Sequence, residues 1–373
     1  MTILRSETDK PMGLFHRIRT VSFVTDSWFT KPATWQLVRY PCGNPYSAPE
    51  ASNPISHYHT SQLTEREDVV VGFRYPHPNP YLPRHEPPPT MAEEATVDHQ
   101  GVDGPPDGLY RYERTANKRV PTLEDVTEED LGFFEEYGYL VIDQALTDEE
   151  VQAARDGMMS LLEAGKEDLI YFEPGLVDDD DDPSEWSPEV KHDYVRKFMH
   201  FVDHSDGMRA PSEKPALLEV LSKLVDGEPE RFADQGMIKP PGGREKPWHQ
   251  DKAYFETALD APVVGVWMAL DPALPENGCM HVIPGSHRDG PVVHFDRRDW
   301  QICDTDVQVD EDVMVPLEPG GLLFFDGLIH HGTPPNDSDK RRRAMQFHYT
   351  AADAEWLEER PDAFGNADKD VTC

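Results

Sequence analysis

The sequence predicts an α+β, mainly β protein whose core is a β-sandwich or jelly roll. Two observations predict this fold. Helix signals are concentrated between residues 121 and 227, and the chain then changes to short apolar strands separated by Pro and Gly. Helices followed by many short strands are typical of an α+β chain built on a sandwich or jelly roll.

The composition divides the chain into three parts. Residues 1–120 are rich in Pro, His and Tyr, and they predict an irregular N-terminal extension that wraps or lids the core. Within it, residues 69–73 are compatible with a short strand. Residues 121–350 form the predicted jelly-roll domain, and residues 351–373 form a C-terminal tail.

Local signals define the elements of the domain. Thr127 is a helix N-cap with Asp130 at the third helical position, and Gly138 ends that helix. Residues 139–142 then predict a strand. Further elements follow: a helix from the capping box Thr147–Glu150 to about Leu162, a helix over 215–225 before Gly227, and strands around Met237 and over 263–270, 280–283, 322–325 and 344–349.

The charge balance narrows the class of partner. The chain has 35 Lys and Arg against 71 Asp and Glu, a net charge of −36 with His neutral. Binding a polyanion requires basic side chains that release counterions, so nucleic acid and an anionic membrane surface are not expected partners. We expect a small-molecule substrate, and a homo-oligomer is compatible with the sequence. A high-salt environment is one source of such a composition.

The cysteines and the apolar runs indicate a compartment. Cys42, Cys279, Cys303 and Cys373 lie far apart, and this spacing favours neither a disulfide framework nor a zinc ribbon. The first ten residues lack the apolar core of a signal peptide. The best apolar run, 261–270, is about half a membrane span. We therefore expect a cytoplasmic protein.

A His-x-Asp pair indicates a metal site. It consists of His249 and Asp251, and residues two apart on a strand face the same side, so both side chains can converge on one ion. Two His and one carboxylate on one face of an octahedron suit a non-haem Fe(II) oxygenase. The second histidine has to come from a distant strand.

A candidate second histidine follows the apolar strand 322–325. This strand leads into the adjacent pair His330 and His331. Adjacent residues on an extended backbone face opposite sides, so at most one of them should reach the metal. The pattern alone leaves open which one.

A basic run opens the last strand. Alternation places Arg342, Gln346 and His348 on one face of that strand. An arginine inside a barrel is costly unless it meets an anion. A dicarboxylate cosubstrate held by the guanidinium fork would supply that anion. The alternative is an interior Asp or Glu.

These residues resemble the phytanoyl-CoA dioxygenase family of Fe(II)/2-oxoglutarate oxygenases, which includes ectoine hydroxylase, from about residue 125 to 350. The resemblance implies a double-stranded β-helix, a cupin-like jelly roll with helices on one sheet, as the oxygenase domain over 121–350. It is carried by the following motifs: Lys239-Pro240-Pro241, Trp248-His249-Gln250-Asp251, Trp267, Pro275-Glu276-Asn277-Gly278, Ile283-Pro284-Gly285-Ser286-His287, and His331-Gly332-Thr333 with Asn336 and Arg342.

The resemblance implies a role for each matched residue. His249, Asp251 and His331 would be the iron ligands, since the family's distal His lies eleven residues before its cosubstrate Arg, as His331 does before Arg342. His330 would be a nearby pocket residue. Arg342 and Thr333 would bind 2-oxoglutarate. Further residues match family positions near that cosubstrate: Gln235, Trp267 and, with a weaker local match, Lys197.

The resemblance also implies an oxidoreductase chemistry. Iron(II), 2-oxoglutarate and dioxygen would hydroxylate an unactivated C–H of a small molecule, with succinate and CO2 as co-products. Related halogenases lack the carboxylate ligand, so Asp251 disfavours halogenation. Desaturation, ring formation and epoxidation remain open. The rival hypotheses are a catalytically silent metal-binding jelly roll that binds or senses a ligand, and a cupin-like Zn or Mn hydrolase or isomerase.

The sequence indicates a class of substrate rather than a particular compound. We expect a polar or acidic small molecule, because aromatic and basic residues lie near the predicted metal site. No basic patch for coenzyme A stands out. The candidate rim consists of Trp248, Lys252, Tyr254, Phe255, His200 and Arg209.

Overall fold

The computed structural model describes residues 104–164, 169–172 and 185–365, all within one compact unit, residues 79–373. The predicted strand at 69–73 and most of the predicted N-terminal extension lie outside the described residues. Predictions for those segments stay predictions.

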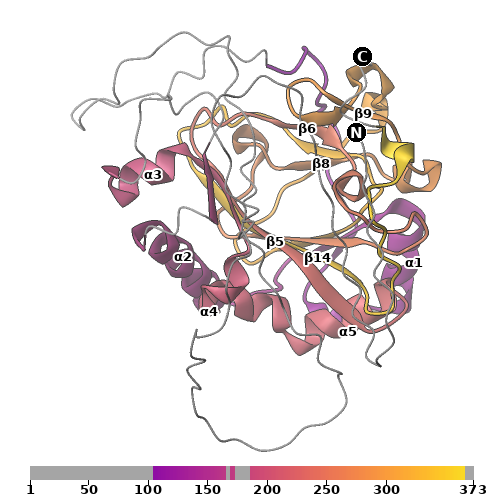
Figure 1. The fold of residues 1–373 in the computed structure, drawn as a ribbon, viewed down its shortest axis with the longest axis horizontal. Coiled ribbons are helices and arrows are strands. Elements are labelled where there is room, and N and C mark those ends of the chain that lie inside the picture. The colour runs from indigo at the N-terminus through magenta and orange to yellow at the C-terminus, as the bar shows by residue number, and fades with distance from the viewer. Residues whose placement is uncertain (1–103, 165–168, 173–184, 366–373) are drawn as a thin grey trace, which may run out of the picture. The chain divides into compact units, whose positions relative to one another are not determined.

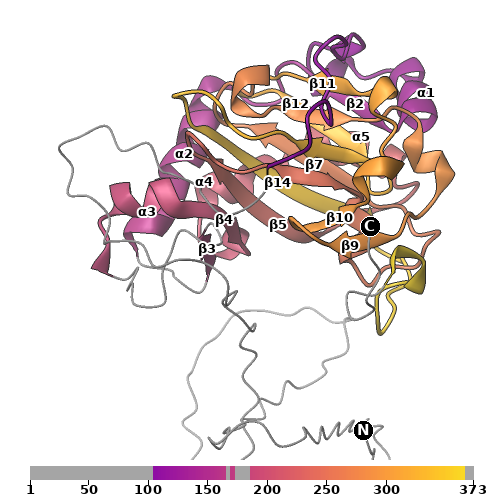
Figure 2. The ribbon, with the colours of Figure 1, turned by 90° about the horizontal axis from the view of Figure 1, so that it is seen from above.

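A large sheet forms one layer of the described domain. Figure 2 shows its strands side by side. Most neighbouring strands pair antiparallel, as in the predicted jelly roll. In spatial order they are β1 (Arg119–Val120), β2 (Tyr139–Ile142), β12 (Leu322–Asp326), β7 (Val264–Ala269), β14 (Arg342–Ala351), β5 (Pro229–Lys239), β4 (Val195–Met199) and β3 (Ile170–Phe172).

A smaller sheet forms a second layer, seen in Figure 1 on the side of β5 and β14 away from the helices. Two further strands, β9 (His294–Asp296) and β10 (Trp300–Ile302), form a hairpin. The smaller sheet has the order β11 (Val313–Val315), β8 (Met280–Val282), β13 (His331–Thr333) and β6 (Lys246–His249).

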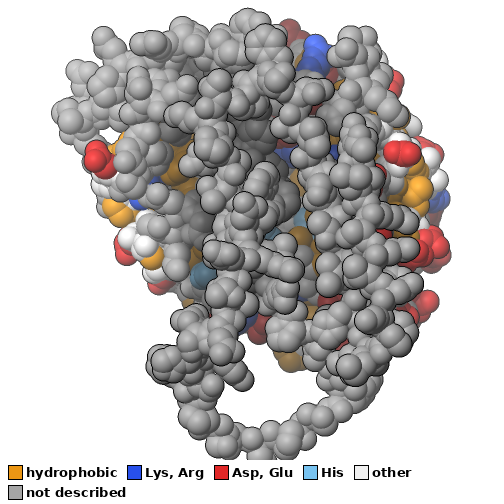
Figure 3. Space-filling view, viewed as in Figure 1, with side chains coloured by type: hydrophobic (Ala, Val, Ile, Leu, Met, Phe, Trp, Pro, Cys, Tyr) orange, Lys and Arg blue, Asp and Glu red, His pale blue; other side chains and the backbone are white. Residues whose placement is uncertain are grey.

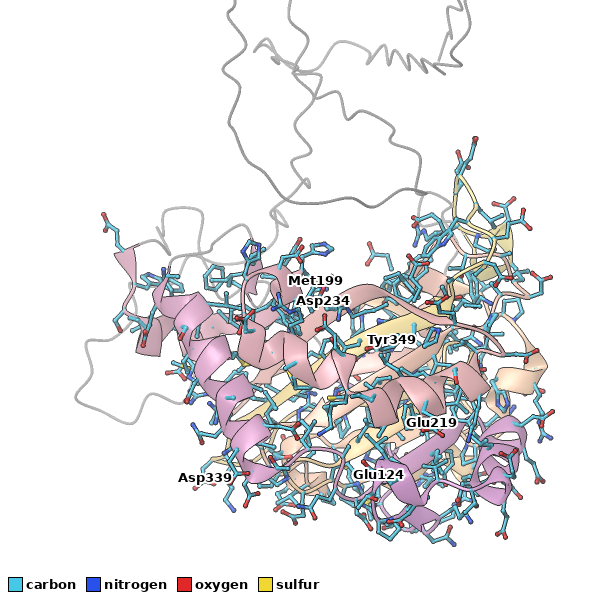
Figure 4. The ribbon with its side chains drawn as sticks, turned by 90° about the horizontal axis from the view of Figure 1, so that it is seen from below. Glu124, Met199, Glu219, Asp234, Asp339 and Tyr349 are labelled. Carbon is cyan, nitrogen blue, oxygen red and sulfur yellow. The ribbon has the colours of Figure 1, made fainter. Side chains whose placement is uncertain are left out.

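Helices cover the other face of the large sheet (Figures 1 and 4). The predicted caps are confirmed: the Thr127–Asp130 box opens the first helix, and Gly138 ends it in the left-handed conformation. The Thr147–Glu150 box opens the second helix. The helices are α1 (Glu128–Tyr137), α2 (Asp148–Glu163), α3 (Pro188–Tyr194), α4 (Asp206–Arg209) and α5 (Pro215–Leu224).

Alternation along β14 separates two cores. Met345, Phe347 and Tyr349 are buried against the helices, whereas Ala344 is buried between the two sheets. The face of β14 that carries Arg342, Gln346 and His348 therefore looks into the space between the sheets, as the alternation predicts.

The described part of the N-terminal extension packs on the domain. Tyr110 stacks on Trp248 at the outer face of the small sheet, with ring centroids 5.4 Å apart. Its hydroxyl donates to Glu245 Oε2 at 3.1 Å. The end of this segment, β1, adds a parallel strand beside β2. Residues 104–120 thus cover one sheet and extend the other.

Three findings bear on the predicted compartment and surface. Within the described ranges, no helix is long and apolar enough to cross a membrane. Cys279 is a buried free thiol. Acidic side chains recur along the edges of the described surface visible in Figure 3, as the net charge leads us to expect.

Gly265 in β7 provides a test of core packing. A Cβ atom at this position would lie 2.1 Å from Cζ of the buried Phe325 ring on the neighbouring strand. Overpacking a dense core typically costs 1–3 kcal/mol, so we expect Gly265→Ala to lower the free energy of unfolding by about that amount. Urea unfolding at neutral pH measures it.

The matched control is Gly132→Ala in α1. No atom of the described residues lies within 4 Å of the added Cβ there. Alanine replaces glycine in a helix interior with a gain of roughly 0.5–1 kcal/mol, so this variant should be slightly more stable. Equal effects of the two substitutions would contradict the packing argument.

His192 in α3 should make stability depend on pH. Burial, with help from Arg341 and Arg343, lowers the pKa of His192 to about 3, against an ordinary value of 6.5. Below pH 6.5 the His192 ring is therefore protonated in the unfolded chain but stays neutral in the folded chain. Stability contributed by the neutral ring is complete above pH 6.5 and is lost as pH falls towards 3.

The expected slope is up to about 1.4 kcal/mol per pH unit for this one group. Between pH 6.5 and 5.5 the wild type should lose about 1 kcal/mol more unfolding free energy than His192→Leu, because the ring of the unfolded wild type is already half protonated at pH 6.5 and the variant has no titrating ring. Urea titrations of both proteins at the two pH values measure the difference. Parallel pH profiles would refute the prediction.

Candidate metal centre

Three side chains that are remote in the chain meet between the two sheets. Candidate ligand atoms of His249, Asp251 and His331 all lie within 4.8 Å of one another, and all three residues are buried. Asp251 Oδ1 is 3.2 Å from His249 Nε2 and 3.5 Å from His331 Nε2. The structure therefore brings together the three residues predicted as metal ligands.

Strand pairing and a strand end produce this convergence. His249 is the last residue of β6, and it lies opposite His331 of β13 in the antiparallel register. Asp251 is not on the strand, contrary to the alternation argument, but begins a 3-10 turn. Gln250 between them still has an extended backbone, with φ −113 and ψ 127. The alternation therefore continues one residue beyond the strand, and His249 and Asp251 still face the same side.

Backbone carbonyls orient both imidazoles. His249 Nδ1 lies 2.7 Å from the carbonyl oxygen of Pro247, and His331 Nδ1 lies 3.1 Å from that of Ile329. A carbonyl only accepts, so each Nδ1 carries the proton and donates it. In the neutral rings, each Nε2 then presents its lone pair towards Asp251, which is the arrangement of a metal-ligating histidine.

Electrostatics favour the charge states that a metal requires. Burial, then the neighbouring His331, lowers the pKa of His249 to about 4. Burial alone would raise the pKa of Asp251, but the facing imidazoles of His331 and His348 outweigh it and hold that pKa well below its usual range. A neutral imidazole beside an ionised carboxylate is the donor set expected for Fe(II).

His330 lies outside the cluster, so His331 is the member of the pair that joins it. Its backbone N–H donates to Ser286 Oγ at 2.8 Å, and both ring nitrogens are buried without a hydrogen-bond partner in the described part of the chain. Burial lowers the pKa of His330 to about 4. The imidazole is therefore a neutral, packed side chain.

Arg342 is a buried guanidinium on the inner face of β14. Its Nη1 donates to the Gly278 carbonyl oxygen at 2.8 Å, and its guanidinium carbon lies 5.2 Å from the Trp267 ring centroid. Burial lowers its pKa to about 10. Arg342 Nε and Trp267 Nε1 have no partner, and Arg342 forms no ion pair within the part of the chain that the structure describes. The alternative of an interior acidic partner is therefore not what the structure shows.

The two neighbouring arginines do have acidic partners. Arg341 pairs with Asp193, and Arg343 donates Nε and Nη2 to the two carboxylate oxygens of Asp271 at 2.8 Å each. Of the three consecutive arginines, Arg342 alone turns inward.

Thr333 lies two residues after His331 on β13. Its Oγ1 accepts a hydrogen bond from Lys239 Nζ at 2.8 Å, which leaves its own hydroxyl proton available. Lys239 lies directly opposite Arg342 in the β14–β5 pairing. In the sequence, Lys239 belongs to a Pro-containing motif, and nothing in that motif indicates a contact with Thr333.

The remaining predicted cosubstrate residues share the inner face of the large sheet. Trp267, Gln346 and Gln235 lie opposite one another across β7, β14 and β5, so their side chains project to one side. Lys197 of β4 lies over the Tyr171 ring, 5.4 Å from its centroid. Burial, then the nearby Lys246 and Arg196, lowers the pKa of Lys197 to about 8.

The predicted substrate rim is only partly assembled. Tyr254 places its ring edge-on to His249, with centroids 5.8 Å apart, and its hydroxyl accepts from Lys246 Nζ at 2.9 Å. Trp248 instead points to the outer face of the small sheet, where Nε1 donates to the Leu109 carbonyl oxygen. Lys252 donates to two backbone carbonyls of the following loop. Neither Trp248 nor Lys252 contributes to a rim.

The chain is similar in sequence to a family model and to known proteins. A sequence model of the family described as Phytanoyl-CoA dioxygenase (PhyH) matches residues 134–344, more than half of the chain. Phytanoyl-CoA dioxygenase domain-containing protein 1 of Danio rerio is 27% identical over 270 residues, which cover 61% of this chain and 90% of the relative. Peroxisomal phytanoyl-CoA dioxygenase of Homo sapiens is 26% identical over 279 residues, covering 70% of this chain and 78% of the relative.

A solved structure shares the fold. The non-heme alpha ketoglutarate dependent carbocyclase SnoK from nogalamycin biosynthesis superposes with a TM-score of 0.50 at 23% identity, covering 65% of this chain and 91% of SnoK. The predicted jelly-roll architecture is thereby confirmed. With the family match over 134–344, the chain belongs to the phytanoyl-CoA dioxygenase family.

Proposed function

We propose that this protein is an Fe(II)- and 2-oxoglutarate-dependent dioxygenase that hydroxylates an unactivated C–H of a small-molecule substrate, with succinate and CO2 as co-products. The observation that carries the proposal is the buried guanidinium of Arg342, which lacks an acidic partner among the described residues. Leaving a buried charge unpaired is strongly unfavourable, and a dicarboxylate cosubstrate supplies the missing anion.

The donor set of the triad fits iron. His249, Asp251 and His331 offer two neutral imidazoles and one carboxylate, which is the facial triad of non-haem Fe(II) oxygenases. A structural zinc site would need a fourth protein ligand, and within the described residues the cluster has three. When bound, iron(II) supplies the activation of dioxygen and the oxidative decarboxylation of 2-oxoglutarate.

The chain's own residues bind and orient the cosubstrate. The Arg342 fork is matched in shape to a carboxylate, and its Nε is a donor that finds no acceptor within the described ranges. The Thr333 hydroxyl, already accepting from Lys239, can donate to the same carboxylate. Lys197, Gln235 and Trp267 complete the inner face of the sheet in this proposal. The triad and the proposed anion site lie on one side of β14.

Hydroxylation is the outcome we assign. Asp251 occupies the ligand position that a halide would need, so halogen transfer is disfavoured. Hydroxylation adds one oxygen atom to the substrate, whereas desaturation and ring closure remove two hydrogens. We also propose a cytoplasmic location, a small-molecule substrate and no nucleic-acid partner.

Succinate formation tests the proposal. Purified protein loaded anaerobically with Fe(II) should release succinate from 2-oxoglutarate only when dioxygen is admitted, and a panel of small organic acids and polar metabolites should accelerate it. Mass spectrometry of the accelerating compound should show a product with one added oxygen. Turnover that survives removal of both dioxygen and 2-oxoglutarate would favour a hydrolase or isomerase. No succinate across the panel would favour a binding protein.

A further inference from the structure

The two carboxylate oxygens of Asp251 have different surroundings. Oδ1 faces the imidazoles of His249 and His331 at 3.2 and 3.5 Å. Oδ2 lies 2.8 Å from Gln346 Nε2 and 2.7 Å from His348 Nε2. Gln346 and His348 are two residues apart on β14, a strand that contributes no member of the triad. One oxygen is thus directed at the metal position and the other is held by the sheet.

The contacts of His348 fix the position of its proton. An ionised carboxylate only accepts hydrogen bonds, so Nε2 must carry the proton and donate it to Asp251. His348 Nδ1 is buried and has no hydrogen-bond partner among the described residues. A proton there would be a buried donor without an acceptor, so Nδ1 bears the lone pair. The Phe255 ring packs edge-on against the His348 imidazole, with ring centroids 4.8 Å apart.

Gln346 completes the arrangement. Its side-chain nitrogen is 3.1 Å from His348 Nε2, and with His348 in this tautomer that is a contact between two donors rather than a hydrogen bond. Two buried donors come so close because both are aimed at one carboxylate oxygen. Rotation of Asp251 to present both oxygens to a metal would leave both N–H groups unsatisfied in the protein interior.

We propose that His348 and Gln346 are positioning residues that hold Asp251 as a one-oxygen metal ligand. A carboxylate bound through both oxygens would take an additional coordination position. Holding Oδ2 away keeps that position open for the cosubstrate or dioxygen. This inference rests on the metal-binding role proposed above, and it assigns to the last strand a second task besides carrying Arg342.

Metal affinity measures the effect directly. His348→Leu and Gln346→Met each remove one donor while keeping a side chain of similar size. Losing an outer hydrogen-bond partner of a metal ligand typically weakens metal binding 10–100-fold, so each variant should raise the Mn(II) dissociation constant by about that factor. Titration followed by the electron paramagnetic resonance of free Mn(II) gives this constant without any turnover.

A spectroscopic readout reports the coordination itself. The visible absorption of protein-bound Co(II) depends on the number of ligands. We expect the Co(II) spectrum to change in His348→Leu, where Asp251 is released to bind through both oxygens. His348→Gln retains an N–H donor and should recover part of both the affinity and the wild-type spectrum.

Tyr349→Phe is the matched control. Tyr349 follows His348 on β14 but faces the helices (Figure 4), and its hydroxyl donates to the Ser212 carbonyl oxygen at 2.6 Å. The substitution removes a buried hydrogen bond from the same strand without touching Asp251. Its Mn(II) affinity and Co(II) spectrum should match the wild type, even if its melting temperature falls.

The outcomes separate this inference from the function on which it rests. If the wild type binds Mn(II) and the folded variants at His348 and Gln346 bind it equally well with an unchanged Co(II) spectrum, the positioning role is refuted and the metal site stands. Equal weakening in Tyr349→Phe would likewise refute it, because general destabilisation would then explain the loss. A wild type that binds no metal would overturn both proposals.

Discussion

Replacing His331 by alanine should abolish metal binding and turnover, whereas the same change at the adjacent His330 should leave both nearly intact. His331 Nε2 faces Asp251, and its Nδ1 proton is held by a backbone carbonyl. Removing a partner of a ligand already costs about 10–100-fold in metal affinity, so removing one of three ligands should cost more than about 100-fold. Mn(II) titration and succinate release measure the two losses.

His330→Ala is a stringent control for this result. Both histidines are buried and adjacent, so the two variants disturb the same stretch of backbone. Truncating the packed His330 ring creates a cavity and should lower stability, with little effect on the metal dissociation constant. If His330→Ala lost the metal and His331→Ala kept it, the two residues would exchange roles and the triad would be wrong.

Elements that have local sequence signals could be predicted from the sequence alone. The capping pairs at Thr127 and Thr147 fix where α1 and α2 begin, because a cap depends on residues only three apart. The alternation over 344–349 also places β14 and its inner face. These signals act within one element, so no knowledge of the fold is required to see them.

Elements whose position depends on long-range strand pairing were harder to predict from the sequence. β4 was not predicted, because its sequence, VRKFM, shows no clean alternation and the strand is placed by its pairing with β5. β6 has four residues and ends at His249, so Asp251 reaches the site through an extended residue and a turn. The likeness to ectoine hydroxylase within the family stays a prediction.

The difference between local signals and long-range contacts also explains which site residues could be predicted from the sequence. His249, Asp251 and His331 carry a recognisable spacing and family motif. Gln346 and His348 were placed on the inner face by alternation, but their contact with Asp251 depends on residues 95 and 97 positions apart. No local pattern can reveal such a contact, and neither residue type is by itself a signal for it.

Replacing Arg342 by alanine should raise the 2-oxoglutarate requirement steeply while leaving metal binding in place. Truncating one partner of a buried charge pair costs about 2–5 kcal/mol. Even the lower value corresponds to roughly a 30-fold increase in the 2-oxoglutarate KM. Succinate release at varied 2-oxoglutarate measures this change, and Mn(II) titration should show an unchanged metal dissociation constant.

Replacing Arg342 should not lower the thermal stability of the protein when it is measured without 2-oxoglutarate. Without cosubstrate, the Arg342 guanidinium is buried without an acidic partner in the described chain, so removing it relieves an unfavourable charge. We therefore expect Arg342→Leu, which fills more of the space than alanine, to melt no lower than the wild type in the absence of 2-oxoglutarate. Added 2-oxoglutarate should then raise the melting temperature of the wild type only.

Arg341→Ala, which breaks an ion pair with Asp193 on α3, is the control for the KM effect and should retain the wild-type KM for 2-oxoglutarate. If Arg341→Ala raised the KM and Arg342→Ala did not, the cosubstrate would be bound on the other face of β14 and the proposed anion site would be wrong.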